Sequence, residues 1–480
     1  MKKKALALVL TLLIVMGCVT FSGAEELISP APVADTYIYV GLFYSNSAVK
    51  EATFTSDEGF IIASHSRSGY SEIQDLRYYK TLVARVENGI INLYDANGNS
   101  VLDTSVVPSG LGNSTALISA ATETDSRIIT VNGKKYREGV VFGAYAADQG
   151  TMAVANYVTL EHYLWGVLNS EMGYENHIEA LKTQAVAARS FAISKIGYHG
   201  GGALGFDVCT TTHCQVYSGM AGEHLKTTEA CQATAGKVIS YNGKVATAYY
   251  HDNNFGYTMS ADEYWGGSNG WCQSVRDPYS KPYEWKTDFT FEELETRLKN
   301  RGKSVGTIKS VQVTERYDNG AVKSLLFKGD EGEVLVSGSN ITSWFNLRSL
   351  GFSMSGNPDP AINKGSSGGM YAKSKTASEV LNSTISVMGA SGEVQNIDIS
   401  AIQIYNGKET TSAPFRITDL SVFTDELVTS GRLYLKGLGN GHCVGMSQSG
   451  AQNMAKAGYT YEDILHYYYT DIEICNYTDL

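Results

Sequence analysis

The stretch that decides the fold is Leu160-Glu-His-Tyr-Leu-Trp-Gly-Val-Leu-Asn-Ser-Glu171-Met172, which predicts the first helix of a chain that otherwise favours strands. Apolar side chains recur in this stretch at helical spacing. They are Leu164, Val167, Leu168 and Met172. Glu171 stands near the end of this helix and just ahead of the next one, so the pattern predicts a carboxylate at a junction between two helices.

A second helix is predicted directly afterwards. Asn176 followed by Glu179 is a capping-box signal, and an apolar stripe rich in alanine continues to Ile196. Alanines in such a stripe indicate that the helix backbone packs closely against a neighbour. The two helices form a predicted pair around residues 162–197.

Two further helices are expected near the C-terminus, around residues 447–469. The first extends from Ser447 to Ala457 and ends at Gly458, and the second is capped by Thr460 with Asp463.

Most of the remaining chain reads as antiparallel strands. Asn-Gly pairs between alternating apolar residues predict hairpins at 97–98, 132–133, 242–243 and 319–320. Thr36–Tyr44 is an expected strand and Lys237–Tyr250 an expected hairpin. The fold class is therefore α+β, mostly antiparallel β, with a few helices that form a substrate cleft.

The chain divides by composition into several parts. Residues 1–24 have a lysine-rich start, an apolar core and a small-residue cleavage site, which predict a signal peptide or, if retained, an anchor. Residues 31–115 are expected to form an N-terminal β segment, and residues 126–474 a second, larger domain with a linker and insertion around 355–430. This organisation predicts an extracytoplasmic protein that is secreted, in the cell wall or membrane-anchored.

The 480-residue chain carries a formal net charge of −11. An acidic balance argues against a nucleic-acid partner, which needs a basic face. A neutral or cationic polymer is the better match.

Glu171 is the candidate catalytic residue, with two possible roles. A glutamate between two helices, close to Trp165 and Met172, can be desolvated, which raises its pKa and suits it to act as an acid. Alternatively it is a solvated charge at the end of a helix, as most glutamates are.

A tight Cys/His group, Cys209-Thr-Thr-Thr-His213-Cys214, predicts a zinc site. His199 is assigned as the fourth ligand, with His224 or a water as the other options. A disulfide between Cys209 and Cys214 is the competing interpretation for an exported protein.

Two more regions contribute candidates. Residues 249–285 are rich in aromatic and polar side chains, which either stack on sugar rings or fill the core. Residues 437–448 are glycine-rich and precede a helix, so a turn there is expected to bring His442 and Gln448 into a cleft.

These motifs in this order resemble the SpoIID/LytB family, named for stage II sporulation protein D. The resemblance rests on residues 160–172, 179–190, 209–217, 251–265 and 439–448, and extends from about Tyr136 to Ile474. It implies a peptidoglycan lytic transglycosylase that cleaves strands without stem peptides between N-acetylmuramic acid and N-acetylglucosamine, leaving 1,6-anhydro-muramic ends. Glu171 occupies the position of the family's catalytic glutamate, and the zinc site would be structural.

The resemblance also implies the substrate-binding residues and partners. A Tyr-x-Lys pair corresponds to Tyr279 and Lys281. The remaining expected substrate-binding residues lie in the matched motifs and are Gln184, Arg189, His251, Asn253, His442 and Gln448. The expected partners are peptidoglycan glycan strands, and a cell-wall amidase or other sporulation membrane proteins.

The sequence departs from the family pattern at one position, where Cys443 replaces a glycine of the Gly-His-Gly-Val-Gly segment. The added side chain beside His442 would either alter the cleft or offer a further zinc or disulfide partner. Two alternative functions remain open: a non-enzymatic glycan-binding module that modifies autolysin activity, and a zinc hydrolase.

Overall fold

The computed structural model describes residues 36–146, 150–200, 202–281, 283–358, 360, 425–429 and 431–480. Between residues 361 and 424 it describes short strands by their backbone, and Phe423 with its side chain. These strands pair as β21 (Ile362–Asn363) with β28 (Val422–Phe423), β22 (Met370–Lys373) with β23 (Ser378–Leu381), β24 (Thr384–Met388) with β25 (Val394–Asp398), and β26 (Gln403–Tyr405) with β27 (Thr410–Ser412).

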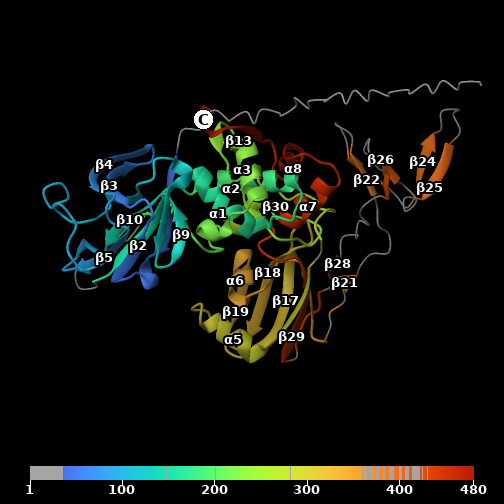
Figure 1. Cartoon of the computed structure of the whole chain (residues 1–480). Helices are drawn as coiled ribbons and strands as arrows, with labels where there is room; N and C mark the ends of the chain where they lie inside the picture. Colours follow the sequence, from blue (N-terminus) through green and yellow to red (C-terminus); the bar gives the residue numbers. More distant parts are fainter. Residues whose placement is uncertain are drawn as a thin grey trace, which may run out of the picture.

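Two sheets, in which most neighbouring strands are antiparallel, form the N-terminal part of the molecule, drawn mostly in blue and cyan in Figure 1. The larger has seven strands in the order β12 (Val208–Cys209), β1 (Tyr37–Phe43), β11 (Met152–Thr159), β10 (Gly139–Ala144), β7 (Thr115–Ser119), β3 (Phe60–Ser66), β4 (Gly69–Leu76). The smaller has five in the order β6 (Ile90–Asp95), β5 (Thr81–Glu87), β2 (Glu51–Thr55), β8 (Ile128–Val131), β9 (Lys134–Arg137). Their inner faces share one apolar core, in which the rings of Phe54 and Phe142 meet edge to face with centroids 5.6 Å apart.

The middle of the molecule is helical (Figure 1). Helix α2 (Ile178–Ser194) packs against α1 (Leu160–Met172), α3 (Leu225–Ala233), α7 (Gln448–Lys456) and α8 (Tyr461–Tyr468). A helix with neighbours on several sides needs small side chains, which explains why the alanines of α2 are buried. The predicted helix pair and the two predicted C-terminal helices are confirmed.

A second core lies around two three-stranded sheets and two helices in the lower part of Figure 1. One sheet has the order β16 (Glu284–Thr290), β29 (Arg432–Leu438), β20 (Phe352–Ser355). The other has the order β17 (Ile308–Arg316), β18 (Val322–Gly329), β19 (Glu333–Ser337), and the helices are α5 (Phe291–Lys299) and α6 (Ser339–Phe345). The α+β class is confirmed.

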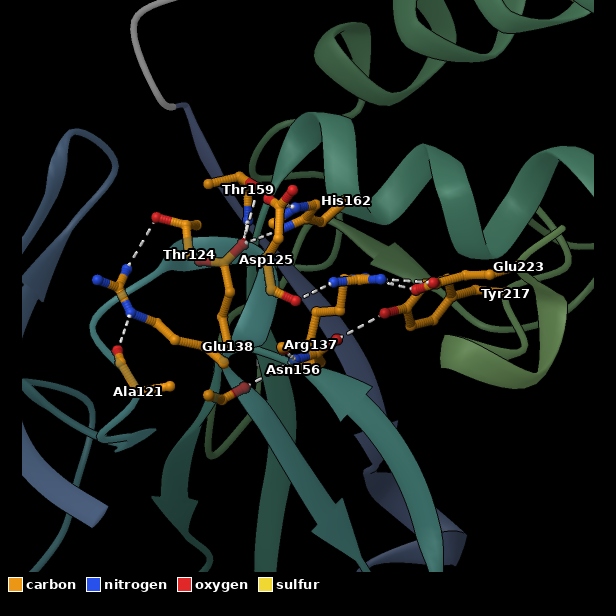
Figure 2. A network of polar contacts seen from close by, with 12 residues as sticks. Ala121, Thr124, Asp125, Arg137, Glu138, Asn156, Thr159, His162, Tyr217 and Glu223 are labelled. Carbon is orange, nitrogen blue, oxygen red and sulfur yellow. Dashed lines mark hydrogen bonds and ion pairs between the residues drawn. The ribbon is translucent and has the colours of Figure 1, made fainter. Parts of the chain in front are cut away.

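Hydrogen bonds and ion pairs fasten α1 to the sheets (Figure 2). Glu138, only 1% exposed, accepts hydrogen bonds at Oε1 from the backbone N and the Oγ1 of Thr159, and His162 Nδ1 lies 2.7 Å from the same oxygen. On the opposite side of the ring, His162 Nε2 lies 3.0 Å from Asp125 Oδ1. Arg137 forms a two-point ion pair with Glu223 and so ties the sheets to the segment that precedes α3.

Some local predictions hold and others are wrong. Asn132-Gly133 and Asn242-Gly243 turn with positive φ at both residues, as type I′ hairpins require. The predicted Asn176 cap is wrong, because His177 is the N-cap of α2 and its Nδ1 accepts from Glu179 N at 3.3 Å. The predicted hairpin 237–250 is shorter than expected: β13 (Lys237–Tyr241) pairs with β14 (Lys244–Val245) and with β31 (Glu473–Asn476).

The predicted division between residues 115 and 126 stays a prediction, but both N-terminal sheets contain strands from either side of it. The predicted signal or anchor at residues 1–24 lies outside the described residues, as does much of the predicted insertion. Within the described part of the chain, no helix combines the length and hydropathy that a membrane span requires.

Candidate functional site

A cleft of about 640 Å³ opens where the ends of several elements meet. Glu171 from the end of α1 and Phe191 and Lys195 from the end of α2 line one part of it. The other lining residues come from elements far away in the sequence, and they are Tyr198, Thr212, His213, Cys214, Tyr249, Tyr250, His251, Asp252, Trp265, Asn440, Gly441, His442 and Gln448.

A short parallel pairing brings two distant segments of this lining together. Strand β15 (Tyr250–His251) pairs with β30 (Met446–Ser447), which directly precedes α7. Helix α7 then begins with Ser447 as its N-cap, whose Oγ accepts from Gly450 N. This arrangement places Gln448 beside Glu171, and the Gln448 amide Nε2 donates to the Glu171 carbonyl oxygen at 3.1 Å.

The Glu171 side chain is partly buried and held at one oxygen. Its Oε1 accepts a hydrogen bond from Val216 N at 2.7 Å. Burial raises the pKa of the carboxyl group, while the Val216 N–H and hydrogen bonding to Gln448 and Tyr250 act in the opposite direction. The raised pKa favours a proton on Glu171, so the group has the property required of a general acid.

The segment that carries Val216 is fixed on both sides. Gln215, fully buried, accepts from the Tyr163 hydroxyl at 3.0 Å and donates to the Tyr250 hydroxyl at 3.1 Å. Gly166 of α1 permits the close approach of this segment, because a Cβ there would lie 2.5 Å from a ring carbon of Tyr217. The position of the Glu171 hydrogen-bond donor therefore depends on the sequence of α1 itself.

Four metal-ligand side chains converge at one wall of the cleft. The donor atoms of His199, Cys209, His213 and Cys214 all lie within 4.8 Å of one another. His199 Nε2 is 3.3 Å from Cys214 Sγ, and His213 Nδ1 is 3.7 Å from Cys209 Sγ and 3.5 Å from Cys214 Sγ. Zinc bonds of about 2.0–2.3 Å in a tetrahedron separate the ligand atoms by roughly 3.3–3.8 Å, so the spacing fits such an ion.

Both cysteines of this cluster are free thiols, as are Cys231, Cys272, Cys443 and Cys475 among the described residues. The disulfide interpretation of Cys209 and Cys214 is therefore not supported. Their mutual hydrogen bond lowers the pKa of Cys209 and raises that of Cys214. Cysteine binds a metal as the thiolate, which the lowered pKa of Cys209 favours.

Two histidines of the cleft are uncharged near neutral pH. Burial lowers the pKa of His251 to about 3 and that of His442 to about 4. His442 Nδ1 accepts from Val444 N at 2.9 Å, so the neutral ring carries its proton on Nε2. Trp265, 45% exposed, packs near Tyr249 and His442 with ring centroids 4.7 and 5.0 Å away.

Cys443 has a conformation that explains why glycine is expected at its position. Its φ is +60°, in the left-handed region that L side chains rarely adopt. Its Sγ is buried within the second core, 3.7 Å from the Asn253 carbonyl oxygen. It does not join the Cys/His cluster, so the expected additional zinc or disulfide role is wrong for the described residues.

Arg189 and Gln184, two of the predicted substrate-binding residues, are buried and inaccessible to a substrate, so the structure contradicts their predicted role. Arg189 is 0% exposed, and its guanidinium binds both carboxylate oxygens of Glu161 as well as the Lys237 and Cys231 carbonyls. Gln184 is also 0% exposed within α2. Arg189 instead joins α1, α2 and the chain after α3.

Three others lie near the cleft without lining it. Tyr279 forms a hydroxyl contact of 3.0 Å with Tyr459, Lys281 N donates to Ser449 Oγ, and the Asn253 side chain is buried. Their roles in substrate binding stay predictions. His251, His442 and Gln448 do line the cleft.

Several cleft residues were not anticipated as site residues. Lys195 is an ordinary helix-end lysine in the sequence, and Asp252 stands out only by adjacency to His251. The Val216 N–H carries no side-chain signal at all. Tyr250 belongs to the aromatic stretch for which a core role and a sugar-stacking role are both expected; it packs against the core and lines the cleft.

The fold and site together define an α+β protein with a glutamate in a polar and aromatic cleft beside a Cys/His cluster. Residues 148–241 match the family model SpoIID, described as Stage II sporulation protein. This match and the relatives below support the assignment of this part of the chain to the SpoIID family.

Three curated relatives illustrate the assignment. The chain is 28% identical to the amidase enhancer of Bacillus subtilis over 65% of this chain, but spans 40% of that relative's length. It is 27% identical to stage II sporulation protein D of B. subtilis, covering 66% of this chain and 74% of the relative. It is 29% identical to an uncharacterized protein of Brachyspira hyodysenteriae, covering 72% and 74%.

Proposed function

We propose that this protein is an extracytoplasmic lytic transglycosylase that cleaves peptidoglycan strands lacking stem peptides. The observation that carries the proposal is the Glu171 carboxyl group, whose pKa is raised by burial and which lines the cleft. Membership of the SpoIID family and the relatives' names, which refer to sporulation and to an amidase, support a place for this activity in cell-wall remodelling or sporulation.

One carboxyl group suffices for this reaction. Protonated Glu171 gives its proton to the glycosidic oxygen, and the bond from that oxygen to C1 of the muramic acid breaks. The C6 hydroxyl oxygen of the same sugar bonds to C1, and its proton returns to Glu171. No water is consumed, and the products are a 1,6-anhydro-muramic end and a free C4 hydroxyl on the neighbouring sugar.

The surrounding residues would orient the sugar and keep the acid in place. Val216 N–H fixes one oxygen of Glu171, and the neutral His251 and His442 offer uncharged polar groups in the cleft. His199, Cys209, His213 and Cys214 would hold a zinc ion with all four positions filled by protein, which is the arrangement of a structural site. The ion would stabilise the segment that leads to Val216.

Hydrolysis is the competing reaction. It requires a second carboxylate in the site, and Asp252, which also lines the cleft, could supply one. Asp252 Oδ2 accepts from Asn440 Nδ2 at 3.0 Å, which occupies one of its oxygens. The products distinguish the two reactions. Mass analysis of denuded glycan strands after incubation with the protein is expected to find anhydro-muramic ends, which disappear with Glu171→Gln and persist with Asp252→Asn.

Ordinary reducing ends that disappear with Asp252→Asn would establish a hydrolase instead. A second candidate function, favoured by the name of the amidase enhancer, is a non-enzymatic module that stimulates a cell-wall amidase. It predicts no glycan products and a stimulation that Glu171→Gln leaves intact.

A further inference from the structure

Lys195 is a positively charged residue in the cleft that the proposed reaction does not use. It is the C-cap residue of α2, so its backbone is fixed by hydrogen bonds to Ala192 and Ile193. Its side chain is half-buried and lines the same cleft as Glu171. The helix end therefore projects an ammonium group into the proposed substrate site.

Three aromatic rings hold this ammonium group. Lys195 Nζ lies 4.7 Å from the ring centroid of Tyr198, 5.3 Å from Phe191 and 5.9 Å from Tyr249. All three distances fall within the range of cation–π attraction. The rings orient the charge without neutralising it, because an aromatic face carries no net charge.

No carboxylate among the described residues forms an ion pair with Lys195. The two carboxyl groups of the cleft have other contacts: Glu171 with Val216 N, and Asp252 with Asn440. Burial lowers the pKa of Lys195, and Cys214 is the one described group whose negative charge acts on Lys195 and raises that pKa. A zinc ion bound to the cluster would offset that charge, since two thiolates and a divalent ion sum to zero. The cleft thus contains a positioned cation with room for an anion.

We propose that Lys195 is a specificity-determining residue that binds the free carboxylate of the substrate's sugar. This inference rests on the proposed function, because it assigns the carboxylate to the lactyl group of muramic acid. That group is a free carboxylate in strands without stem peptides and a neutral amide in strands that carry them. An ammonium group forms a charge-assisted hydrogen bond with the first and loses the charge attraction with the second.

The test compares two strands that differ only in this charge. One is the denuded glycan, and the other is the same glycan with its lactyl carboxyls converted to methylamides. Binding is measured in the Glu171→Gln background, where strands are not cut. The free-acid strand is expected to bind about 10- to 100-fold more tightly, the factor expected for one hydrogen bond to a charged group, and the preference is expected to shrink as salt is added.

Adding Lys195→Met, which keeps an unbranched side chain of similar length, is expected to abolish the preference by weakening only the free-acid complex. Lys195→Arg is expected to keep it. Lys244→Met is the matched control, because Lys244 is exposed in β14 and lies outside the cleft lining. Equal circular dichroism and equal bound metal verify that the variants are folded.

The outcomes separate this inference from the proposed function. Three results would overturn the role of Lys195. The Glu171→Gln protein could bind the two strands equally, or bind neither measurably. Alternatively, Lys195→Met could weaken the binding of both strands equally. A charge preference that depends on Lys195 without any cleavage by the unmodified protein would support that role while refuting the transglycosylase. Cleavage by the unmodified protein without a charge preference would support the transglycosylase and refute the role of Lys195.

Discussion

Two glutamates, the buried Glu138 and the partly buried Glu171, lie at opposite ends of α1 in different surroundings. Near the start of the helix, Glu138 Oε1 lies within hydrogen-bond distance of three groups: Thr159 N, Thr159 Oγ1 and His162 Nδ1. Near the end, Glu171 Oε1 accepts from the Val216 backbone N–H, and the side chain lines an open cleft. Figure 2 shows the polar contacts of the first carboxylate.

Burial alone does not make a carboxyl group reactive. The donors that contact Glu138 Oε1 all belong to the fold, so these contacts stabilise the junction between the sheets and α1. Glu171 has a desolvated carboxyl with a raised pKa and space for a ligand beside it. The combination of desolvation and access separates the candidate acid from the structural anion.

The largest expected effect is on catalysis with Glu171→Gln. Removal of the transferable proton is expected to lower the rate of glycan cleavage by roughly 10²- to 10⁴-fold, as measured by release of anhydro-muramic ends. The same substitution is expected to leave the free energy of unfolding unchanged at acidic pH and to raise it at neutral pH.

The sign follows from the pKa shift. Glu171 has a raised pKa in the folded state, so the folded protein binds the proton more tightly than the unfolded chain and loses stability as pH rises above the unfolded pKa. Glutamine does not ionise, so the Glu171→Gln protein does not lose this stability as the pH rises. Urea titrations at several pH values check this, and a variant that is less stable than the parent at neutral pH would argue that Glu171 is a structural anion like Glu138.

The next largest effect is on stability with Glu138→Ala. The change leaves the Thr159 and His162 groups without their buried acceptor, which is expected to cost about 1–3 kcal/mol of unfolding free energy for each buried donor left unsatisfied. Cleavage per folded molecule should change little. Glu123→Ala, at an exposed position, is the control and should stay within about 0.5 kcal/mol. A loss of cleavage without a loss of stability would contradict the structural role of Glu138.

A smaller effect is expected from removing the metal cluster. Cys214→Ser, or a chelator, should lower the melting temperature and reduce cleavage by up to about 100-fold, because Val216 lies two residues beyond Cys214 and small displacements of a positioning group are costly. Metal content is measured alongside activity. Cys231→Ser, at a buried cysteine outside the cluster, separates loss of metal from loss of packing. Complete retention of activity without metal would make the cluster irrelevant to Glu171.

Local patterns predicted the elements of this fold well but not its site. The helix pair follows from apolar spacing within α1 and α2, and the hairpins follow from Asn-Gly pairs, since each signal lies within a few residues. The cap of α2 was placed one residue early because Asn176 and His177 can both accept from the first turn, and only the path of the preceding chain selects between them.

The composition of the cleft could not be predicted in the same way. Arg189 is a charged residue on a helix near Glu171, yet its face of α2 turns toward Glu161 and the core, because α2 has neighbours on several sides. Lys195 reaches the cleft because α2 ends there. The parallel pairing of β15 with β30 brings His251 to the segment before Gln448, and such long-range pairing has no local signal. The pattern of side chains in a sequence does not indicate which backbone groups, such as Val216 N–H, will serve as hydrogen-bond donors in a site.

The smallest effect is expected from Tyr250→Phe, which removes one hydrogen-bond donor from Glu171. Hydrogen bonding to Tyr250 lowers the pKa of the Glu171 carboxyl, against the larger effect of burial. In Tyr250→Phe the ionised carboxylate loses this support, so the pKa of Glu171 rises further and the protonated acid persists to higher pH. The alkaline limb of the cleavage rate at saturating glycan should therefore move to higher pH, with less than about a tenfold change in the maximum rate. Tyr241→Phe, a tyrosine outside the cleft lining, should leave the profile in place. A shift of the limb to lower pH would mean that the group titrating on that side is not Glu171, and that this carboxyl is held as firmly by its surroundings as Glu138 is.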